Sequence, residues 1–195
     1  MIPASAPSTA SPMPPFSRPA AFFDRDGVLN VDYGYVADPA RLELVAGAAQ
    51  AVRLCNAAGY LVLVVTNQSG VARGLYDEAA VARFHAALRI RLATEGAVVD
   101  DFRHCPHHPT AGIGAYVRDC DCRKPKPGMI LDLAHRWSVD MTRSFLVGDK
   151  PSDVAAAAAA GIPGLLFDGR DLPILVAAGL AGAAGAPLSS PSRAG

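Results

Sequence analysis

Two aspartates, Asp24 and Asp26, lie two residues apart in the segment FFDRDGVLN that begins at Phe22. Two carboxylates at this spacing repel each other unless a cation lies between them. A solvated turn is the simplest alternative, because aspartate and the glycine that follows, Gly27, both favour turns. The pair alone does not distinguish a turn from a functional site, so the other polar residues of the chain have to decide.

Further polar residues supply what an aspartate pair would need for chemistry. Thr66 and Asn67 follow one apolar run, Asp149 follows another, and Lys124 lies between them in the sequence. Carboxylates at strand ends make a hard oxygen site that favours Mg²⁺. An aspartate beside this ion can act as a nucleophile, and a second aspartate can act as acid and base. Thr66 and Lys124 offer a donor and a positive charge for a phosphate, so the set predicts phosphoryl transfer.

The elements that must hold these residues alternate between strand and helix. This order predicts an α/β fold with a doubly wound parallel sheet, in which ligands bind at the carboxyl ends of the strands. Cys55 is expected in the core and His85 on the surface. Apolar runs predict strands at residues 20–23, 60–65, 98–102, 144–147 and 164–167. Helices are predicted at residues 48–58, 77–95 (with Asp77 as the cap), 127–137 and 155–160.

The chain has 195 residues and is 51% hydrophobic, which suits one domain with a proper core. Its 18 basic and 18 acidic side chains balance, so we expect no nucleic-acid or membrane partner. Residues 1–18 are rich in Pro, Ser and Ala and are predicted to form a disordered leader. Residues 19–180 are predicted to form the domain and residues 181–195 a flexible tail. The leader lacks the features of a secretory signal, so a cytoplasmic protein is expected.

Three of the four cysteines lie in one loop, in the pairs CPH and CDC. Three thiolates and one imidazole would make a closed tetrahedral Zn²⁺ site, which leaves no open position for a substrate. The alternative is three free thiols in a surface loop, and His104 and His108 compete for the position of the imidazole. A zinc ion would pin the loop directly before residues 123–124. The candidate ligands are Cys105, His107, Cys120 and Cys122.

Four segments resemble, in order, the four motifs of the haloacid dehalogenase (HAD) superfamily of phosphatases. They are residues 24–30 (DRDGVLN), 64–67 (VVTN), Lys124 within RKP, and residues 147–153 (VGDKPSD). Four motifs in the right order are far more specific than two aspartates alone. The resemblance implies a Rossmann-like HAD fold, and the spacing between the motifs leaves no room for a large cap domain.

Further segments are similar to the D-glycero-D-manno-heptose 1,7-bisphosphate phosphatases and the related histidinol-phosphatases. They are residues 32–36 (DYGYV), 66–74 (TNQSGVARG) and 120–125 (CDCRKP). By that similarity Asp24 is the nucleophile and Asp26 the general acid/base. The similarity also supports zinc, with the four loop residues named above as ligands.

The same resemblance implies the remaining site residues. Mg²⁺ would be bound by Asp24, the carbonyl of Asp26 and Asp149. Thr66 and Lys124 would bind the transferred phosphoryl group, and Asp153 would orient Lys124 or a metal-bound water. Contacts with the substrate are implied for Asp32, Tyr33, Gly34, Tyr35, Thr66, Asn67, Gln68, Ser69, Arg123, Lys124 and Lys150.

The activity implied is a Mg²⁺-dependent phosphatase that acts on a small phosphorylated sugar. For the heptose enzymes this is removal of the 7-phosphate through an aspartyl-phosphate, on the route to nucleotide-activated heptose for lipopolysaccharide. A histidinol-phosphatase is the alternative enzyme, and the residues leave both anomers of the heptose open. A non-catalytic zinc-containing binding module is the alternative from another class. We expect the protein to be a monomer.

Overall fold

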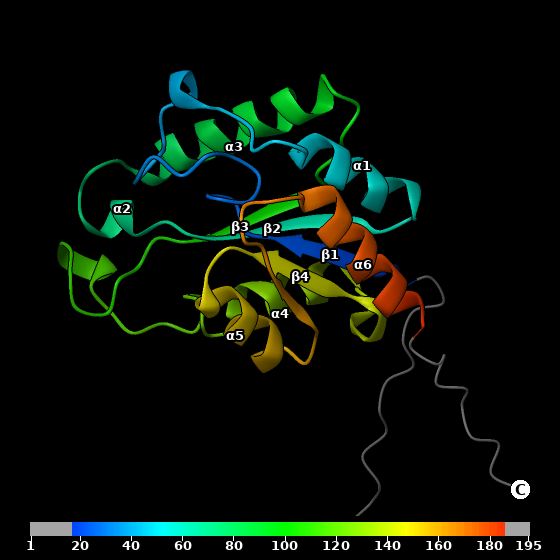
Figure 1. Ribbon diagram of the computed structural model, residues 1–195. Helices are drawn as coiled ribbons and strands as arrows, with labels where there is room; N and C mark the ends of the chain where they lie inside the picture. Colours follow the sequence, from blue (N-terminus) through cyan, green and yellow to red (C-terminus); the bar gives the residue numbers. More distant parts are fainter. Residues whose placement is uncertain (1–16, 186–195) are drawn as a thin grey trace, which may run out of the picture.

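The computed structural model describes residues 17–185 and contains one five-stranded sheet in which every strand pair is parallel (Figure 1). The strand order is β3-β2-β1-β4-β5, and Phe23 at the end of β1 pairs with Val64 and Val147 in its two neighbours. The predicted doubly wound α/β fold is therefore confirmed. The strands are β1 Ala20–Phe23, β2 Leu61–Asn67, β3 Asp101–Cys105, β4 Phe145–Gly148 and β5 Gly164–Leu166.

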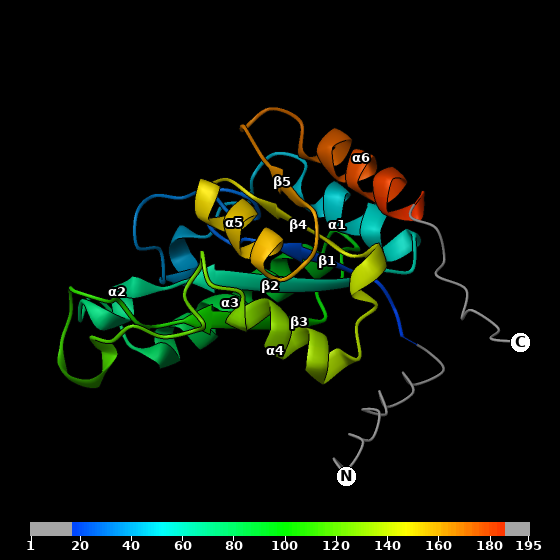
Figure 2. The same cartoon turned by 90° about the horizontal axis from the view of Figure 1, so that it is seen from below.

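Helices cover both faces of the sheet, as Figures 1 and 2 show from two directions. Helices α1, α3 and α6 lie on one face, and α4 and α5 lie on the other. The short helix α2 follows β2 at the edge of the molecule. The helices are α1 Ala48–Ala57, α2 Ser69–Ala72, α3 Glu78–Ala93, α4 Gly128–Trp137, α5 Pro151–Ala159 and α6 Leu172–Ala184.

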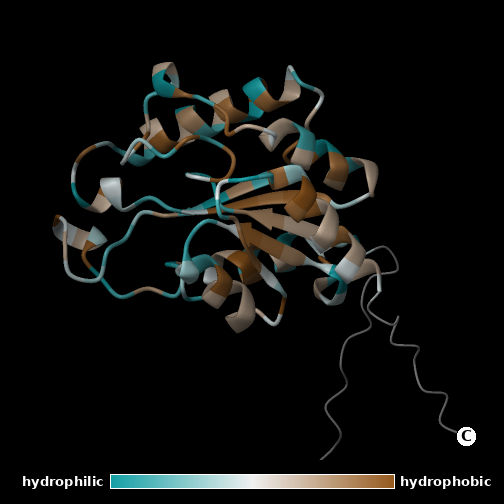
Figure 3. Ribbon diagram, viewed as in Figure 1, coloured by the Kyte–Doolittle hydropathy of each residue, from teal (hydrophilic) through white to brown (hydrophobic). Residues whose placement is uncertain are grey.

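The side chains of β1 alternate between two hydrophobic cores. Ala21 and Phe23 pack toward α1, α3 and α6, while Ala20 and Phe22 pack toward α4 and α5. A strand that is covered on both faces needs apolar residues at every position, which explains why β1 is apolar throughout. Figure 3 shows the same hydrophobic character in the strands at the centre of the molecule.

The order of the strands creates a crevice at their carboxyl ends. The chain runs from β1 to β2 and β3 on one side of the sheet, and β4 and β5 lie on the other side of β1. A crevice forms where the direction of winding reverses in this way. Asp24 follows β1, Thr66 lies near the end of β2 and Asp149 follows β4, so the fold brings the three predicted polar ends to one edge.

Two predictions about the region around β3 were wrong. The strand covers residues 101–105 instead of 98–102: its register with β2 begins at Asp101 opposite Leu63, while Asp100 contacts Val62 through both its backbone N–H (2.9 Å) and its carboxylate (2.7 Å). His85, expected on the surface, is 8% exposed and stacks on Phe102 with ring centroids 4.6 Å apart. Burial lowers the pKa of His85 to about 2, so the ring is neutral.

Helix α6 was not predicted from the sequence, and it extends past the expected start of the tail at residue 181. Its residues are almost all apolar or small, so they show no polar face that would mark a helix. Leu172 and Val176 are fully buried in the same core as α1. At the other end of the chain, Arg18 donates hydrogen bonds to the carbonyls of Gly59 and Tyr60, so this residue of the expected leader contacts the domain. Residues 1–16 and 186–195 lie outside the described part of the chain.

Between β1 and α1 the chain forms loops and one short turn, Pro39–Arg41. Between β2 and α3 it forms only α2 and the adjoining turns. Over residues 17–185 these segments therefore contain no separate cap domain. No helix in this range is long and apolar enough to cross a lipid bilayer.

Two glycines of α6 are expected to respond in opposite ways to replacement by alanine. A methyl group at Gly179 would lie 2.8 Å from Leu165 and 2.9 Å from the Phe145 ring, whereas one at Gly182 meets no atom within 4 Å. Gly182→Ala should raise the free energy of unfolding by about 0.5 kcal/mol through helix propensity. Gly179→Ala should lower it by about 1 kcal/mol through overpacking. Urea unfolding measures both, and equal effects would contradict the packing of α6.

Candidate active site

The predicted nucleophile Asp24 is held by a buried lysine. The Nζ atom of Lys124 lies 2.8 Å from Oδ1 of Asp24, 2.7 Å from Asp153 and 2.8 Å from the carbonyl oxygen of Val65. All three N–H donors of the ammonium group therefore have acceptors. Burial alone would lower the pKa of Lys124, but the carboxylates of Asp24 and Asp153 outweigh burial and raise it, so the group stays charged.

Three carboxylates beside this lysine form an arrangement that fits a divalent cation. Oxygen atoms of Asp24, Asp149 and Asp153 lie within 4.8 Å of one another. Oδ1 of Asp149 is buried and has no hydrogen-bond partner among the described residues. Burial, with Asp24 and Asp153 nearby, raises the pKa of Asp149 to about 6. An unpaired buried oxygen in an all-carboxylate group is what a hard cation such as Mg²⁺ would satisfy.

Gly27 makes room for this cation site. Its φ of +86° lies in the left-handed region, and a Cβ atom here would collide with the carboxylate of Asp149. Any other residue at this position would therefore push the β4 carboxylate away from the aspartate pair. The glycine that favoured a turn in the sequence thus serves the site as well as the turn.

The second aspartate, Asp26, has its own cation. Arg25 donates to both carboxylate oxygens at 2.9 Å, Asn30 donates to Oδ1 at 3.0 Å, and Gln68 donates to Oδ2 at 2.7 Å. The repulsion between the two aspartates is thus relieved on the protein side by two separate cations, Lys124 and Arg25. From the sequence, only a shared metal was expected for this purpose.

Arg25 is fully buried and links the aspartate pair to the loop that follows it. Its guanidinium lies 4.5 Å from the centre of the Phe84 ring and donates a hydrogen bond to the carbonyl of Val36 (2.7 Å). The cation–π contact and the ion pair both favour a charged arginine in this interior position. The role of Arg25 was not predicted, because a charged residue between two aspartates suggests a solvated turn in the sequence.

A chain of hydrogen bonds joins the phosphate-binding candidate Thr66 to residues on the next loop. Nε2 of Gln68 donates to Oγ1 of Thr66 (2.9 Å) as well as to Asp26, and the hydroxyl of Tyr76 donates to Oε1 of Gln68 (2.8 Å). Burial raises the pKa of Tyr76 to about 12, so the phenol keeps its proton at neutral pH. Thr66 and Gln68 are 1% and 2% exposed, which makes this a buried polar network.

A cavity of about 360 Å³ opens above these groups. It is lined by both catalytic candidates and by every predicted substrate contact except Tyr33. Tyr33 lies outside the cavity, is half exposed and donates a hydrogen bond to Glu43. Tyr76 and Ser152 line the cavity but were not predicted: Tyr76 lies outside the motifs, and no role was assigned to Ser152 within the fourth motif. The predicted residues in the lining are Asp24, Asp26, Asp32, Gly34, Tyr35, Thr66, Asn67, Gln68, Ser69, Arg123, Lys124 and Lys150.

Loop residues on two sides of the cavity are fixed by specific contacts. Asn67 donates to the carbonyl of Lys124 and accepts from its backbone N–H, both at 3.0 Å, so it holds the lysine backbone. Lys150 lies 3.3 Å from the carboxylate of Asp32 and 3.8 Å from that of Asp149. Tyr35 adopts a left-handed conformation with φ +51°, which costs energy for a residue other than glycine and often occurs at functional sites.

The predicted zinc ligands converge in the loop after β3. The three sulfur atoms of Cys105, Cys120 and Cys122 lie 3.1–3.5 Å apart, and Nδ1 of His107 lies 3.4 Å from the nearest of them. Tetrahedral Zn²⁺ with bonds of about 2.3 Å places sulfurs about 3.8 Å apart, so the group fits zinc after small adjustments. The competing histidines are engaged elsewhere: His104 faces Glu78, and His108 accepts from backbone N–H groups.

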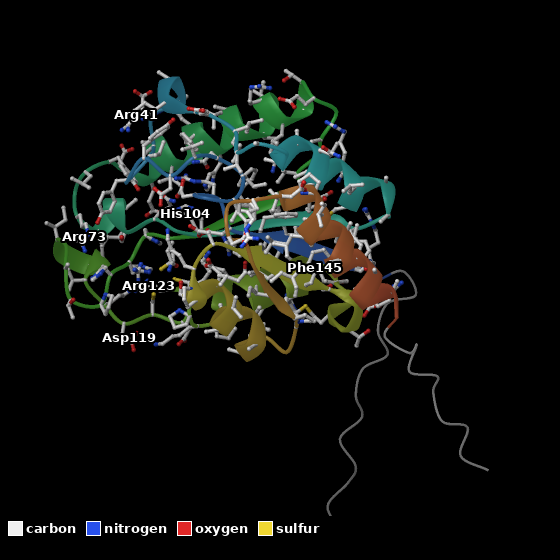
Figure 4. The ribbon with its side chains drawn as sticks, in the orientation of Figure 1. Arg41, Arg73, His104, Asp119, Arg123 and Phe145 are labelled. Carbon is white, nitrogen blue, oxygen red and sulfur yellow. The ribbon has the colours of Figure 1, made fainter. Side chains whose placement is uncertain are left out.

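This loop supports the cavity from one side. The guanidinium of Arg123 donates to the carbonyl oxygen of His107 (3.2 Å), and the backbone N–H of Gln68 donates to the carbonyl of Cys105 (2.8 Å). Figure 4 shows Arg123 on the side of the molecule that holds the loop with Asp119, opposite the end of the sheet where Phe145 lies. Two of the candidate zinc ligands, His107 and Cys105, therefore contact Arg123 and the end of β2 through their backbone carbonyls.

Comparisons with known proteins agree with this geometry. A HAD-hydrolase-like family model matches residues 121–169. The D-glycero-beta-D-manno-heptose-1,7-bisphosphate 7-phosphatase of Rhodopseudomonas palustris is 55% identical over 159 residues, which cover 82% of this chain and 88% of that protein.

Two solved structures are similar to the whole fold. A HAD-like phosphatase from Mesorhizobium loti has a TM-score of 0.79 and 37% identity, over 88% of this chain and 90% of that one. The D,D-heptose 1,7-bisphosphate phosphatase of B. bronchiseptica, solved with magnesium and phosphate, has a TM-score of 0.72 and 34% identity, over 84% of this chain and 99% of that one.

Replacing Asp149 by asparagine should stabilise the metal-free protein at neutral pH. A carboxyl group whose pKa is raised by folding favours the fold below its unfolded pKa, and this contribution is lost as the pH rises through the folded value, here about 6. With a chelator at pH 7.5, Asp149→Asn should be about 1–2 kcal/mol more stable than wild type, with no difference near pH 4.

Millimolar magnesium should then stabilise the wild type but not Asp149→Asn. The exposed Asp168 provides a matched control, because Asp168→Asn should respond to magnesium as the wild type does. Thermal unfolding at several pH values measures all three proteins. Equal stability of Asp149→Asn and wild type from pH 4 to pH 8 in chelator would contradict the cation site.

Loss of one zinc ligand should weaken substrate binding more than catalysis. Cys120→Ser should lower the zinc content and raise KM about tenfold, because Arg123 and the β2 end lose their support. Cys55→Ala is the control, since Cys55 lies in the core beside α1 and should leave zinc and KM unchanged. Zinc analysis and steady-state kinetics test this, and a zinc-free Cys120→Ser protein with an unchanged KM would refute it.

Proposed function

Because this chain belongs to the family of D-glycero-beta-D-manno-heptose-1,7-bisphosphate 7-phosphatases, we propose that it removes the 7-phosphate from this sugar bisphosphate. The reaction is hydrolysis of a phosphoric monoester. The observation that carries the proposal is the cluster of Asp24, Lys124, Asp149 and Asp153, of which all but Asp149 line the cavity that also contains Asp26. The β anomer is the expected substrate, since the relatives are named for it.

Asp24 is proposed to attack the phosphorus atom of the 7-phosphate. The backbone N–H of Arg25 and the ammonium group of Lys124 both donate to Oδ1 of Asp24. Among residues 17–185, no donor contacts Oδ2. Oδ2 is thus the oxygen available for the new bond. The bond between phosphorus and the C7 oxygen breaks, and Asp26 gives that oxygen a proton. The dephosphorylated sugar leaves, and the phosphoryl group remains on Asp24.

Water then completes the reaction. Asp26, now ionised, takes a proton from a water molecule that attacks the same phosphorus atom. The bond to Asp24 breaks, inorganic phosphate is released and both aspartates return to their starting state. The three side chains that donate to Asp26 keep its carboxylate at one place for both proton transfers.

Mg²⁺ is proposed to be bound by Asp24, Asp149 and the carbonyl of Asp26. When bound, it supplies positive charge for the oxygens of the phosphoryl group. Asp153 holds Lys124 in place at 2.7 Å. Thr66 offers its hydroxyl hydrogen to the phosphoryl group, because its oxygen already accepts a hydrogen bond from Gln68. Zn²⁺ in the cysteine loop has a structural role only.

A sugar that carries two phosphates needs positive charge beyond the reacting centre. Arg123 and Lys150 line the cavity on different sides, and both are proposed to contact the part of the substrate that is not transferred. The product would enter the synthesis of nucleotide-activated heptose for lipopolysaccharide. A monomeric state, a cytoplasmic location and the absence of nucleic-acid and membrane partners stay predictions, as do the roles of individual site residues.

Phosphate release with Mg²⁺ should be at least tenfold faster, in kcat/KM, for the β anomer of the heptose 1,7-bisphosphate than for the α anomer or for histidinol phosphate. Asp24→Asn should lose activity by about a thousandfold or more, because no nucleophile remains. The control Asp168→Asn lies outside the cavity and should behave as the wild type. Preferential turnover of histidinol phosphate would overturn the substrate, and an active Asp24→Asn protein would overturn the mechanism.

A further inference from the structure

The amide group of Gln68 contacts two residues of the proposed reaction through the same nitrogen atom. One hydrogen of Nε2 points to Oδ2 of Asp26 at 2.7 Å and the other to Oγ1 of Thr66 at 2.9 Å. This orientation matters chemically because an amide has donors at one end only. A rotated amide would place its oxygen against the carboxylate of Asp26, which has no hydrogen to donate while it is ionised.

A rotated amide would also change what Thr66 does. In the observed orientation the hydroxyl oxygen of Thr66 accepts from Gln68, which leaves the hydroxyl hydrogen free for the phosphoryl group. With the amide oxygen in that place, the same hydrogen would be donated to Gln68 instead. The orientation of one side chain thus controls a hydrogen bond to Asp26 and the direction in which Thr66 donates.

The carboxylate of Asp26 accepts but does not donate, so it favours this orientation, and at the other end of the amide the orientation is supported by the hydroxyl of Tyr76. This hydroxyl donates to Oε1 of Gln68 at 2.8 Å, so it stabilises the arrangement in which Nε2 faces Asp26 and Thr66. The tyrosine ring can occupy this position because residue 70 is glycine: a Cβ atom there would collide with the Tyr76 ring and its hydroxyl. Tyr76 lies at the edge of the cavity, on the loop between α2 and α3.

We infer that Tyr76 is a positioning residue, which acts through Gln68 to aim N–H donors at the general acid/base Asp26 and at the phosphate-binding Thr66. The inference rests on the proposed function for the roles of Asp26 and Thr66. It assigns to Gln68 a structural task inside the site, in place of the direct substrate contact that the family resemblance implied. Gly70 contributes to this positioning, because its lack of a side chain leaves room for the tyrosine ring.

The experiment compares an alkyl phosphate with an aryl phosphate, because only the alkyl leaving group depends strongly on a proton from Asp26. Glycerol phosphate and p-nitrophenyl phosphate serve as the two substrates with Mg²⁺. Tyr76→Phe should lower kcat/KM about tenfold on glycerol phosphate, the loss expected for one buried hydrogen bond. The loss on p-nitrophenyl phosphate should be at least threefold smaller. Equal losses on both substrates, or no loss on either, would overturn the inference.

A double-mutant cycle tests whether Tyr76 acts through Gln68. In a Gln68→Ala background, Tyr76→Phe should cost no further activity, whereas independent roles would give additive losses and refute the inference. Gly70→Ala should reproduce the substrate dependence of Tyr76→Phe by displacing the ring. Tyr60→Phe is the matched control, because Tyr60 is a buried tyrosine before β2, at the opposite end from the cavity.

These tests are separate from the test of the proposed substrate. Glycerol phosphate and p-nitrophenyl phosphate report on Asp26 and Thr66 whichever sugar phosphate the enzyme prefers. A wild-type protein that hydrolyses both simple esters but not the heptose bisphosphate would overturn the proposed function and leave the role of Tyr76 decided by the cycle. Thermal unfolding of Tyr76→Phe within a few degrees of wild type shows that the measured losses are local.

Discussion

The compensation of buried negative charge is the constraint on which the rest of this active site depends. Asp24, Asp26, Asp149 and Asp153 converge at the carboxyl ends of two strands, where burial would make four carboxylates very unfavourable. Two buried cations compensate them: Lys124 lies beside Asp24, the proposed nucleophile, and Arg25 lies beside Asp26, the proposed acid/base. A divalent cation between Asp24 and Asp149 would compensate further negative charge.

The different partners of the two aspartates explain how carboxylates so close together can have different roles. Asp24 faces Lys124 and the metal ligands, while Asp26 is surrounded by Arg25, Asn30 and Gln68. The difference comes from the second layer of residues, because the two carboxylates are chemically identical. Helix α3 contributes through Phe84, which supports Arg25, and the loop before it contributes through Tyr76. The loop that carries the candidate zinc ligands supports Arg123 in a similar way, through the carbonyl oxygen of His107.

Much of the fold could be predicted from patterns that are local in the sequence. The apolar runs of β1, β2 and β4 mark strands that are covered on both faces, and Asp77 marks the start of α3. The elements that were misplaced or missed lack the apolar pattern by which the others were found, although Asp171 caps α6 as Asp77 caps α3. Strand β3 lies at the edge of the sheet and carries polar residues, so pairing with β2 determines where it begins. Helix α6 has no polar face, because it packs against α1 and its residues are almost all apolar or small.

In the active site, too, local features can be predicted from the sequence, whereas contacts between distant segments cannot. The identity of the reacting groups, the order of the four motifs and the ligand types of both metals are properties of single residues and short spacings, so the amino-acid sequence alone carries them. Which groups meet across the fold depends on packing between distant segments. Only the three-dimensional structure shows that Arg25 lies in the interior and not in solvent. It also shows that Tyr33 lies outside the cavity, and that His107, not His104 or His108, joins the three cysteines. It also joins Tyr76 to Asp26 through Gln68, since a hydrogen bond between segments that are far apart leaves no pattern in the sequence.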